Sequence, residues 1–224
     1  PIPEDEDEAD ELPEEPKDDR PIRVAIIGRP NVGKSTLVNR LIGEERMLTG
    51  PEPGITRDAI EIPWAAQGRK FVLIDTAGLR KKARIEDPVE RLSTADTLQS
   101  LRETQVAILV LDATLMLEKQ DLAIARLAIE EGRALVIAVN KWDLIDEERQ
   151  RYLEREIERD LHQVSWAPRV NVSARTGRHM EKLVPALNLA LKNWDRRIPT
   201  SKLNAFIAEL VAAHPHPLRG GRQP

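Results

Sequence analysis

Residues 28–35 carry the side chains whose types and spacing are best suited to chemistry. They read GRPNVGKS, match the pattern G-x-x-x-x-G-K-[S/T], and follow an apolar run, Val24–Ile27, that is typical of a buried strand. The two glycines let the backbone wrap around phosphate oxygens, and the helix expected at Lys34 adds the positive end of its dipole. Lys34 can reach the β and γ phosphates, and the Ser35 hydroxyl can bind a bridging magnesium ion. The segment therefore predicts binding of a nucleoside triphosphate.

A second motif, DTAG at residues 75–78, begins with an acidic residue and follows another strand-like run, Phe71–Ile74. In this D-x-x-G arrangement, the Asp75 carboxylate can hold magnesium through a water molecule and the Gly78 N–H can meet the γ phosphate. Alone, a D-x-x-G tetrapeptide is usually an ordinary turn, and so is the N-K-x-D tetrapeptide that occurs later in the chain at residues 140–143. The interpretation as a nucleotide site therefore depends on the order and spacing of all the motifs together.

Residues 140–143 (NKWD) come directly after the apolar run Ala134–Val139 and carry the information about the base. Asp143 can accept hydrogen bonds from the N1–H and the exocyclic amine of guanine. Adenine has an acceptor at that ring nitrogen and no amine at C2, so it would leave a desolvated carboxylate facing a lone pair. Further along, residues 173–177 (SARTG) form a loop suited to closing over the base with backbone N–H groups. The sequence therefore predicts guanine.

Alternating elements must position these motifs, and each motif stands at the C-terminal end of a strand-like run, where an open parallel sheet binds its ligand. Polar stretches at 43–58 and 79–88 are expected to be loops. Further strands are expected at 59–64, 69–74, 106–111 and 170–172, and helices at 34–42, 90–101, 119–131, 147–161 and 180–194, the last kinked at Pro185. This alternation predicts an α/β fold with a mostly parallel six-stranded sheet and helices on both faces.

The composition agrees with one modest domain plus extensions. A chain of 224 residues, 41% of them hydrophobic, can bury one sizeable core, and because aromatic residues are only 3%, aliphatic side chains must fill it. The absence of cysteine excludes disulfides. No apolar run approaches membrane-spanning length and no signal peptide is present, so we expect a soluble, cytoplasmic protein with no membrane partner.

Charge is concentrated at the N-terminus. Residues 1–20 hold eleven acidic and two basic side chains, interleaved with prolines, which is typical of a disordered linker or tail. The remaining chain has 32 basic and 27 acidic residues. That balance is compatible with a polyanionic partner such as RNA, and a solvated basic face explains it equally well.

The four motifs, the text PGITRD at residues 53–58 and the region 21–197 together resemble the Der (EngA) family of Era-like GTPases, most closely its second GTPase domain. The resemblance implies a P-loop GTPase fold that hydrolyses GTP to GDP and phosphate as a molecular switch. It also implies a monomeric G domain that acts in assembly of the large ribosomal subunit, with rRNA contacted through the full-length protein. Residues 1–20 would be an acidic linker, 21–197 the GTPase domain, and 198–224 the truncated start of a C-terminal KH-like domain, so the chain would be a fragment.

The resemblance also implies roles for individual residues. The phosphates would be held by Asn31, Val32, Gly33, Lys34, Ser35 and Thr36. Magnesium would be bound by Ser35, Thr56 and Asp75. Asn140, Lys141 and Asp143 would frame guanine, with Ser173, Ala174 and Arg175 behind it. Residues 43–58 and 76–90 would be switches, ordered by γ-phosphate contacts of Thr56 and Gly78. Catalysis would involve Asn31, Lys34, Thr56 and Gly78.

The hydrolytic mechanism departs from the Ras-like pattern. Leu79 follows Gly78 where those enzymes place the glutamine that orients the attacking water. In related GTPases with asparagine at the position of Asn31, its side-chain oxygen helps to hold a potassium ion against the β and γ phosphates, which would stabilise charge developing in the transition state. The resemblance therefore predicts potassium as a cofactor besides GTP or GDP and magnesium. Alternatively, Asn31 only shapes the loop, because asparagine tolerates turn conformations.

Other functions stay open on the sequence. One is a G domain from an Era-like or tRNA-modification GTPase, and another is a nucleotide-gated RNA- or protein-binding module with negligible intrinsic hydrolysis. The acidic segment in front of the domain favours the Der family over the first alternative. Measurement of single-turnover hydrolysis separates the second from an active GTPase.

Overall fold

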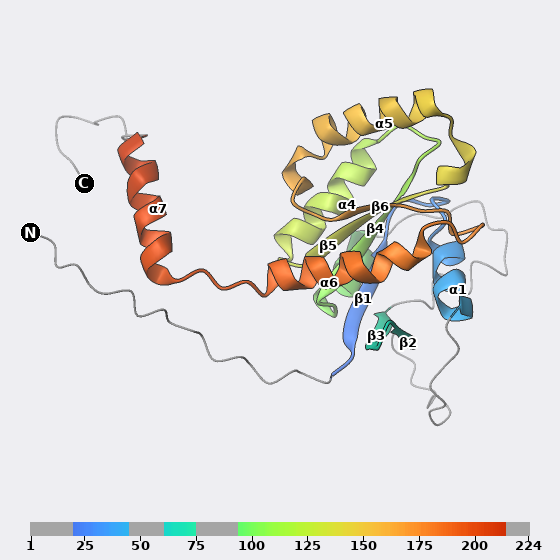
Figure 1. The fold of residues 1–224 in the computed structure, drawn as a ribbon, viewed down its shortest axis with the longest axis horizontal. Coiled ribbons are helices and arrows are strands. Elements are labelled where there is room, and N and C mark those ends of the chain that lie inside the picture. The colour runs from blue at the N-terminus through green and yellow to red at the C-terminus, as the bar shows by residue number, and fades with distance from the viewer. Residues whose placement is uncertain (1–19, 45–60, 75–93, 214–224) are drawn as a thin grey trace, which may run out of the picture.

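The computed structural model describes residues 20–44, 61–74 and 94–213. A six-stranded sheet with the order β2-β3-β1-β4-β5-β6 forms its centre (Figure 1). The pairs β1–β3, β1–β4, β4–β5 and β5–β6 are parallel, and β2 pairs antiparallel with β3. The strands are β1 Ile22–Ile27, β2 Ile62–Ala66, β3 Arg69–Ile74, β4 Val106–Asp112, β5 Ala134–Asn140 and β6 Arg169–Asn171. This topology confirms the predicted fold class.

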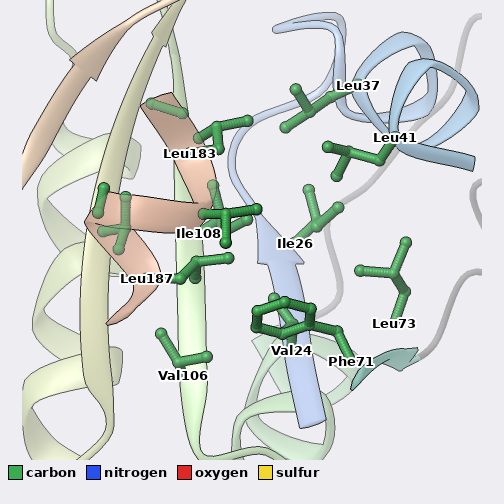
Figure 2. Close-up of a cluster of buried hydrophobic side chains, with 14 of the residues drawn as sticks. Val24, Ile26, Leu37, Leu41, Phe71, Leu73, Val106, Ile108, Leu183 and Leu187 are labelled. Carbon is green, nitrogen blue, oxygen red and sulfur yellow. The ribbon is translucent and has the colours of Figure 1, made fainter. Parts of the chain in front are cut away.

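Helices cover both faces of the sheet. They are α1 Lys34–Glu44, α3 Thr94–Arg102, α4 Lys119–Glu130, α5 Glu147–Asp160 and α6 Leu183–Trp194, and a further helix, α7 Thr200–Ala213, follows them in the chain. One core layer joins α1 and α6 to the sheet, and the opposite layer joins α3, α4 and α5 to it. Figure 2 shows the first layer, in which Ile26, Ile108, Leu37 and Leu187 come from β1, β4, α1 and α6 and point toward one another. Aliphatic side chains fill this core, as the low aromatic content requires.

The strands that lead to the site are buried because they lie at the centre of the sheet. All seven residues of β4 and all seven of β5 are buried, which explains why both read as continuous apolar runs without alternation. At the sheet edge, Gln67 and Gly68 both have positive φ (50° and 76°), as a tight two-residue hairpin turn requires. On one face of this edge strand, Trp64 is buried and its ring stacks on Phe71.

Three boundaries differ from the expectation. The strand expected at 59–64 is observed as β2 Ile62–Ala66, and the helix expected at 90–101 as α3 Thr94–Arg102, with 59–60 and 90–93 outside the described residues. The expected kinked helix is instead a short 3₁₀ helix, Met180–Lys182, followed by α6. Pro185 lies in the first turn of α6, where a missing N–H removes no helical hydrogen bond, so it ends no helix.

The last helix, α7, lies apart from the sheet (Figure 1), and none of its residues is buried. Its exposed apolar side chains are Leu203, Phe206, Ile207, Leu210 and Val211. The acidic segment before residue 20 and the segment after residue 213 lie outside the part of the chain that the structure describes. Within the described part, no helix has the length and apolar character needed to cross a membrane.

Candidate functional site

The loop at residues 28–33 links β1 to α1 and depends on two glycines that pack closely against other backbone and side-chain atoms. Gly28 has φ 147°, and a Cβ there would lie 2.5 Å from the Val110 carbonyl oxygen of β4. Gly33 has φ 96°, and a Cβ there would collide with the Asn140 side-chain amide. A larger residue at either position would therefore push the loop away from the ends of β4 and β5.

Lys34 begins α1, and its side chain turns back into the same loop. Its Nζ donates hydrogen bonds to the carbonyl oxygens of Gly28 at 2.8 Å and Arg29 at 2.5 Å, and the residue is only 8% exposed. Ser35 is the second residue of α1 and is half-buried, so its hydroxyl lies at the helix N-terminus beside the lysine. A buried ammonium and a helix N-terminus in one loop attract anions, as phosphate binding requires.

Three further members of the predicted phosphate set shape or line this loop. Asn31 is exposed and adopts the left-handed conformation, with φ 61°. Val32 is fully buried in the core, and its carbonyl oxygen accepts a hydrogen bond from Asn140. Thr36 is exposed on the first turn of α1. The loop conformation accounts for an asparagine at position 31, and whether its side chain also binds a cation stays a prediction.

Asn140 joins the three parts of the site. It ends β5 and is 2% exposed, and its Nδ2 donates to the Val32 carbonyl oxygen at 2.9 Å. Its Oδ1 accepts a hydrogen bond from the Ala174 N–H, also at 2.9 Å. The phosphate loop and the loop after β6 are therefore held to the end of β5 by one side chain, which uses both its donor and its acceptor.

Lys141 and Asp143 follow Asn140 with their side chains partly accessible. Lys141 has φ 61°, and its Nζ lies 2.5 Å from Oδ2 of the buried Asp112 at the end of β4. Burial alone would raise the pKa of Asp112, but hydrogen bonds from Lys141 and Thr114 outweigh it and hold that pKa below its ordinary value. Asp143 is half-buried in a 3₁₀ turn, Trp142–Leu144, placed beside β6 by a bond from the Trp142 N–H to the Val172 carbonyl.

The loop after β6 is a tight turn. Ser173 is fully buried, and its Oγ accepts a hydrogen bond from the Thr176 N–H at 3.1 Å. Its carbonyl oxygen accepts one from the Gly177 N–H at 2.9 Å. Ala174 is buried beside Asn140, whereas Arg175 is exposed at the tip of the turn. The structure thus brings the predicted base-binding residues to the same edge as the phosphate loop.

Three predicted site residues lie outside the described residues, namely Thr56, Asp75 and Gly78. Both predicted switch segments, 43–58 and 76–90, fall there as well, except that Gly43 and Glu44 complete α1. Of the three predicted magnesium ligands, the structure therefore describes only Ser35, whose hydroxyl oxygen is of the ligand type that this ion binds. The magnesium roles of all three residues stay predictions.

Sequence reasoning missed several charged side chains that brace the site. Arg29 is buried, and its Nε donates to Oδ1 of Asp121 on α4 at 2.8 Å, with a second ion pair to Glu118. Asp121 also accepts the Glu118 N–H, which caps α4. Arg149 on α5 donates to the Ala113 and Leu115 carbonyls in the loop after β4. Only Asp112 had a usable signal in the sequence, since it directly follows an apolar run, as Asp75 does.

Curated relatives match nearly all of the chain. A protein named GTPase Der from Leifsonia xyli is 55% identical over 204 residues, which are 91% of this chain and 42% of that protein. GTPase Der from Streptomyces coelicolor is 51% identical over 91% of this chain and 44% of its own length. The chain thus spans less than half of the length of these relatives. They confirm the resemblance to the Der family that the sequence indicates.

Solved structures share the fold. An Era protein from Aquifex aeolicus, bound to GDP and aluminium fluoride, matches 80% of this chain and 58% of its own with 25% identity and a TM-score of 0.55. Elongation factor SelB from Methanococcus maripaludis matches 80% of this chain and 35% of its own at a TM-score of 0.58, and its 18% identity supports the fold alone. The model of the 50S ribosome-binding GTPase family matches residues 23–141, more than half of the chain. The chain belongs to the family of 50S ribosome-binding GTPases.

Proposed function

We propose that this chain binds GTP and GDP and hydrolyses GTP to GDP and phosphate as a molecular switch. The observation that carries the proposal is the position of Asn140, which ties the phosphate loop at Val32 to the base loop at Ala174. A phosphate site and a base site joined through one buried side chain can accept a single nucleotide that spans both. Membership of a GTPase family supports the same reading.

The phosphate half of the reaction rests on Lys34 and the loop around it. The Lys34 ammonium bonds to two loop carbonyls, so a nucleotide's phosphate oxygens can replace those partners without moving the charge far. Ser35, Thr56 and Asp75 would hold magnesium, which would supply charge neutralisation between the β and γ phosphates. Gly78 would meet the γ phosphate through its N–H.

Guanine recognition rests on Asp143, which is half-buried at the edge of the site. Its carboxylate would accept from N1–H and the 2-amine, and adenine offers neither donor. Calorimetric titration of the protein with GDP and ADP tests this, and comparable affinities would overturn the guanine assignment. The variant Asp143→Asn should shift the preference toward xanthine nucleotides, because the amide donates to the C2 carbonyl that xanthine carries.

Potassium is proposed as a second cation of the site, held by the Asn31 side-chain oxygen. Because Asn31 has φ 61°, Asn31→Ala would strain the loop, and an altered loop conformation could not be told apart from a lost cation. Asn31→Gly keeps the conformation and removes the side-chain oxygen. We expect the parent to hydrolyse GTP about tenfold faster, or more, in potassium than in sodium at matched ionic strength. The stimulation should disappear in Asn31→Gly, and equal parent rates in both salts would refute the cation role.

The cellular role proposed is assembly of the large ribosomal subunit, as part of a longer Der protein in which this is the second GTPase domain. The names of the relatives and of the family support the Der and ribosomal parts of this role, and the chain covers only 42% of one such relative. The exposed apolar face of α7 suits the start of a further domain after residue 198, and residues 1–20 suit an acidic linker. Stable association with large subunits should require a longer protein, so equally tight binding by residues 21–197 alone would contradict this division.

A nucleotide-gated binding module without useful hydrolysis is the second candidate. It is kept because Leu79 stands where Ras-like enzymes have glutamine. Single-turnover hydrolysis by the purified chain with magnesium and potassium decides between them. Turnover of bound GTP supports the switch enzyme, and its absence supports the binding module.

A further inference from the structure

Arg40 connects the helix after the phosphate loop with the turn after β6. It lies on α1 and is half-buried. Its Nε donates to the Ala174 carbonyl oxygen at 3.0 Å, and its Nη2 donates to the carbonyl oxygen of Arg175. The partners are separated from Arg40 by 134 and 135 residues in the sequence, so these contacts form only when the sheet is complete.

The two carbonyls that Arg40 binds belong to the tip of the turn. Ala174 is held at both of its backbone groups, since its N–H donates to Asn140 Oδ1 and its carbonyl accepts from Arg40. The Thr176 N–H is also occupied, because it donates to Ser173 Oγ. Among residues 20–44, 61–74 and 94–213, the Arg175 N–H has no hydrogen-bond acceptor, and it lies at the exposed tip between these fixed groups.

We propose that Arg40 is a positioning residue that fixes this turn so that a backbone N–H reaches the 6-oxygen of the bound purine. Arg40 thereby sets the selectivity for a 6-oxo group and the lifetime of the bound nucleotide. A planar guanidinium has forked donors that suit two neighbouring carbonyls, whereas a lysine ammonium replaces only part of that geometry. The inference rests on the proposed guanine-nucleotide function and adds a residue outside the four motifs.

The test measures release and selectivity separately in Arg40→Ala and Arg40→Lys. Arg102→Ala is the matched control. Arg102 is an exposed arginine in the last turn of α3, and it pairs with Glu131 at the C-terminal end of α4. Release of a fluorescent GDP should be about tenfold faster in Arg40→Ala than in the parent, because two hydrogen bonds from a charged guanidinium to the turn are lost. The release rate should be intermediate in Arg40→Lys and unchanged in Arg102→Ala.

Selectivity is measured by calorimetry with GDP, 6-thio-GDP and IDP. 6-Thio-GDP replaces only the 6-oxygen by a larger and weaker acceptor, and IDP lacks only the 2-amine that Asp143 would read. We expect Arg40→Ala to lose most of the preference for GDP over 6-thio-GDP and to keep the preference for GDP over IDP. Arg40→Lys gives the same comparison if Arg40→Ala does not fold.

Two results would overturn the role of Arg40. One is an unchanged release rate and unchanged preferences, and the other is an equal fall of both preferences, which a general loosening of the base site would produce. In either case a parent that prefers GDP to ADP leaves the guanine function intact. A parent that binds ADP as tightly as GDP overturns the guanine function itself, whatever Arg40 does.

Discussion

Replacement of Asn140 by alanine tests the central contact of the site. The change removes two hydrogen bonds of 2.9 Å and leaves the Val32 carbonyl and the Ala174 N–H without their partner, in residues that are 0% and 2% exposed. Each of the two orphaned buried groups costs about 1–3 kcal/mol, so we expect a loss of about 2–6 kcal/mol in the free energy of unfolding. That is a large share of the roughly 5–15 kcal/mol by which a domain is stable. Urea denaturation without nucleotide measures it.

Two further variants make this measurement specific. Asn140→Asp has the same size and keeps an acceptor for Ala174, but it places an oxygen against the Val32 carbonyl oxygen, so we expect a comparable loss. Asn193→Ala, at an exposed position of α6, should change the free energy of unfolding by no more than about 0.5 kcal/mol. A loss below about 1 kcal/mol in Asn140→Ala would refute the reasoning, because the loops would then hold their positions without this side chain.

Three more variants probe the surroundings of the site. Asp121→Ala should lower the free energy of unfolding by about 3–5 kcal/mol, because it leaves the buried Arg29 guanidinium without its buried carboxylate partner and with only the exposed Glu118. Asp112→Asn should destabilise the protein at neutral pH by a margin that is constant well above pH 3.8 and shrinks below it. The reason is that the pKa of the paired carboxylate is lowered from 3.8 in the folded state, so its contribution is lost only as pH falls through that lower value. Gly33→Ala should weaken GDP binding by about tenfold or more, because φ 96° is strained for alanine and its Cβ collides with the Asn140 amide.

For each of these three variants, one experimental outcome would contradict the expected effect. For the buried ion pair, the double variant Arg29→Met with Asp121→Leu should recover part of the loss, so an additive loss in denaturation would be contrary evidence. For Asp112→Asn, a margin that grows as pH falls from 5 to 3 in parallel denaturation series would reverse the assigned sign. For Gly33→Ala, Gly132→Ala is the matched control, since Gly132 also has positive φ (62°) but no atom near its Cβ position. Equal calorimetric affinities of the two glycine variants would show that the collision is immaterial.

The sequence predicted the elements whose signals are local. Runs such as Val106–Leu111 and Ala134–Val139 are continuous and apolar because their strands are buried on both faces, and the structure extends each by one polar residue, Asp112 and Asn140. The motif residues then meet at one edge because parallel strands end together there. The order and composition of the chain therefore sufficed for the fold and for most of the described site.

The bracing arginines could not be predicted in the same way. Arg29, Arg40 and Arg149 each bind carbonyl oxygens of a distant loop, and a backbone carbonyl leaves no trace in the sequence of its partner. The conformation of Asn31 and the helix start before Pro185 also depend on tertiary packing. Local patterns indicate which face of an element is buried, whereas these side chains act across the gaps between elements.

The strand order has a consequence for the time course of folding. β1 is made early but lies between β3 and β4, so it cannot complete its pairing until Leu109, its last partner on β4, has joined the chain. Among the strand pairs that the structure describes, only the β2–β3 hairpin is local. Such hairpins form in about 1–10 μs, whereas pairing between distant strands must first close long loops and is slower. The contact from Val32 to Asn140 can close only when residue 140 is present, and the contact from Asn140 to Ala174 only when residue 174 is present. A nascent chain that ends before Ala174 therefore has a phosphate loop with an incomplete base site. Tight nucleotide binding should appear only after the turn after β6 and helix α6, which completes the core layer on that face, have been made.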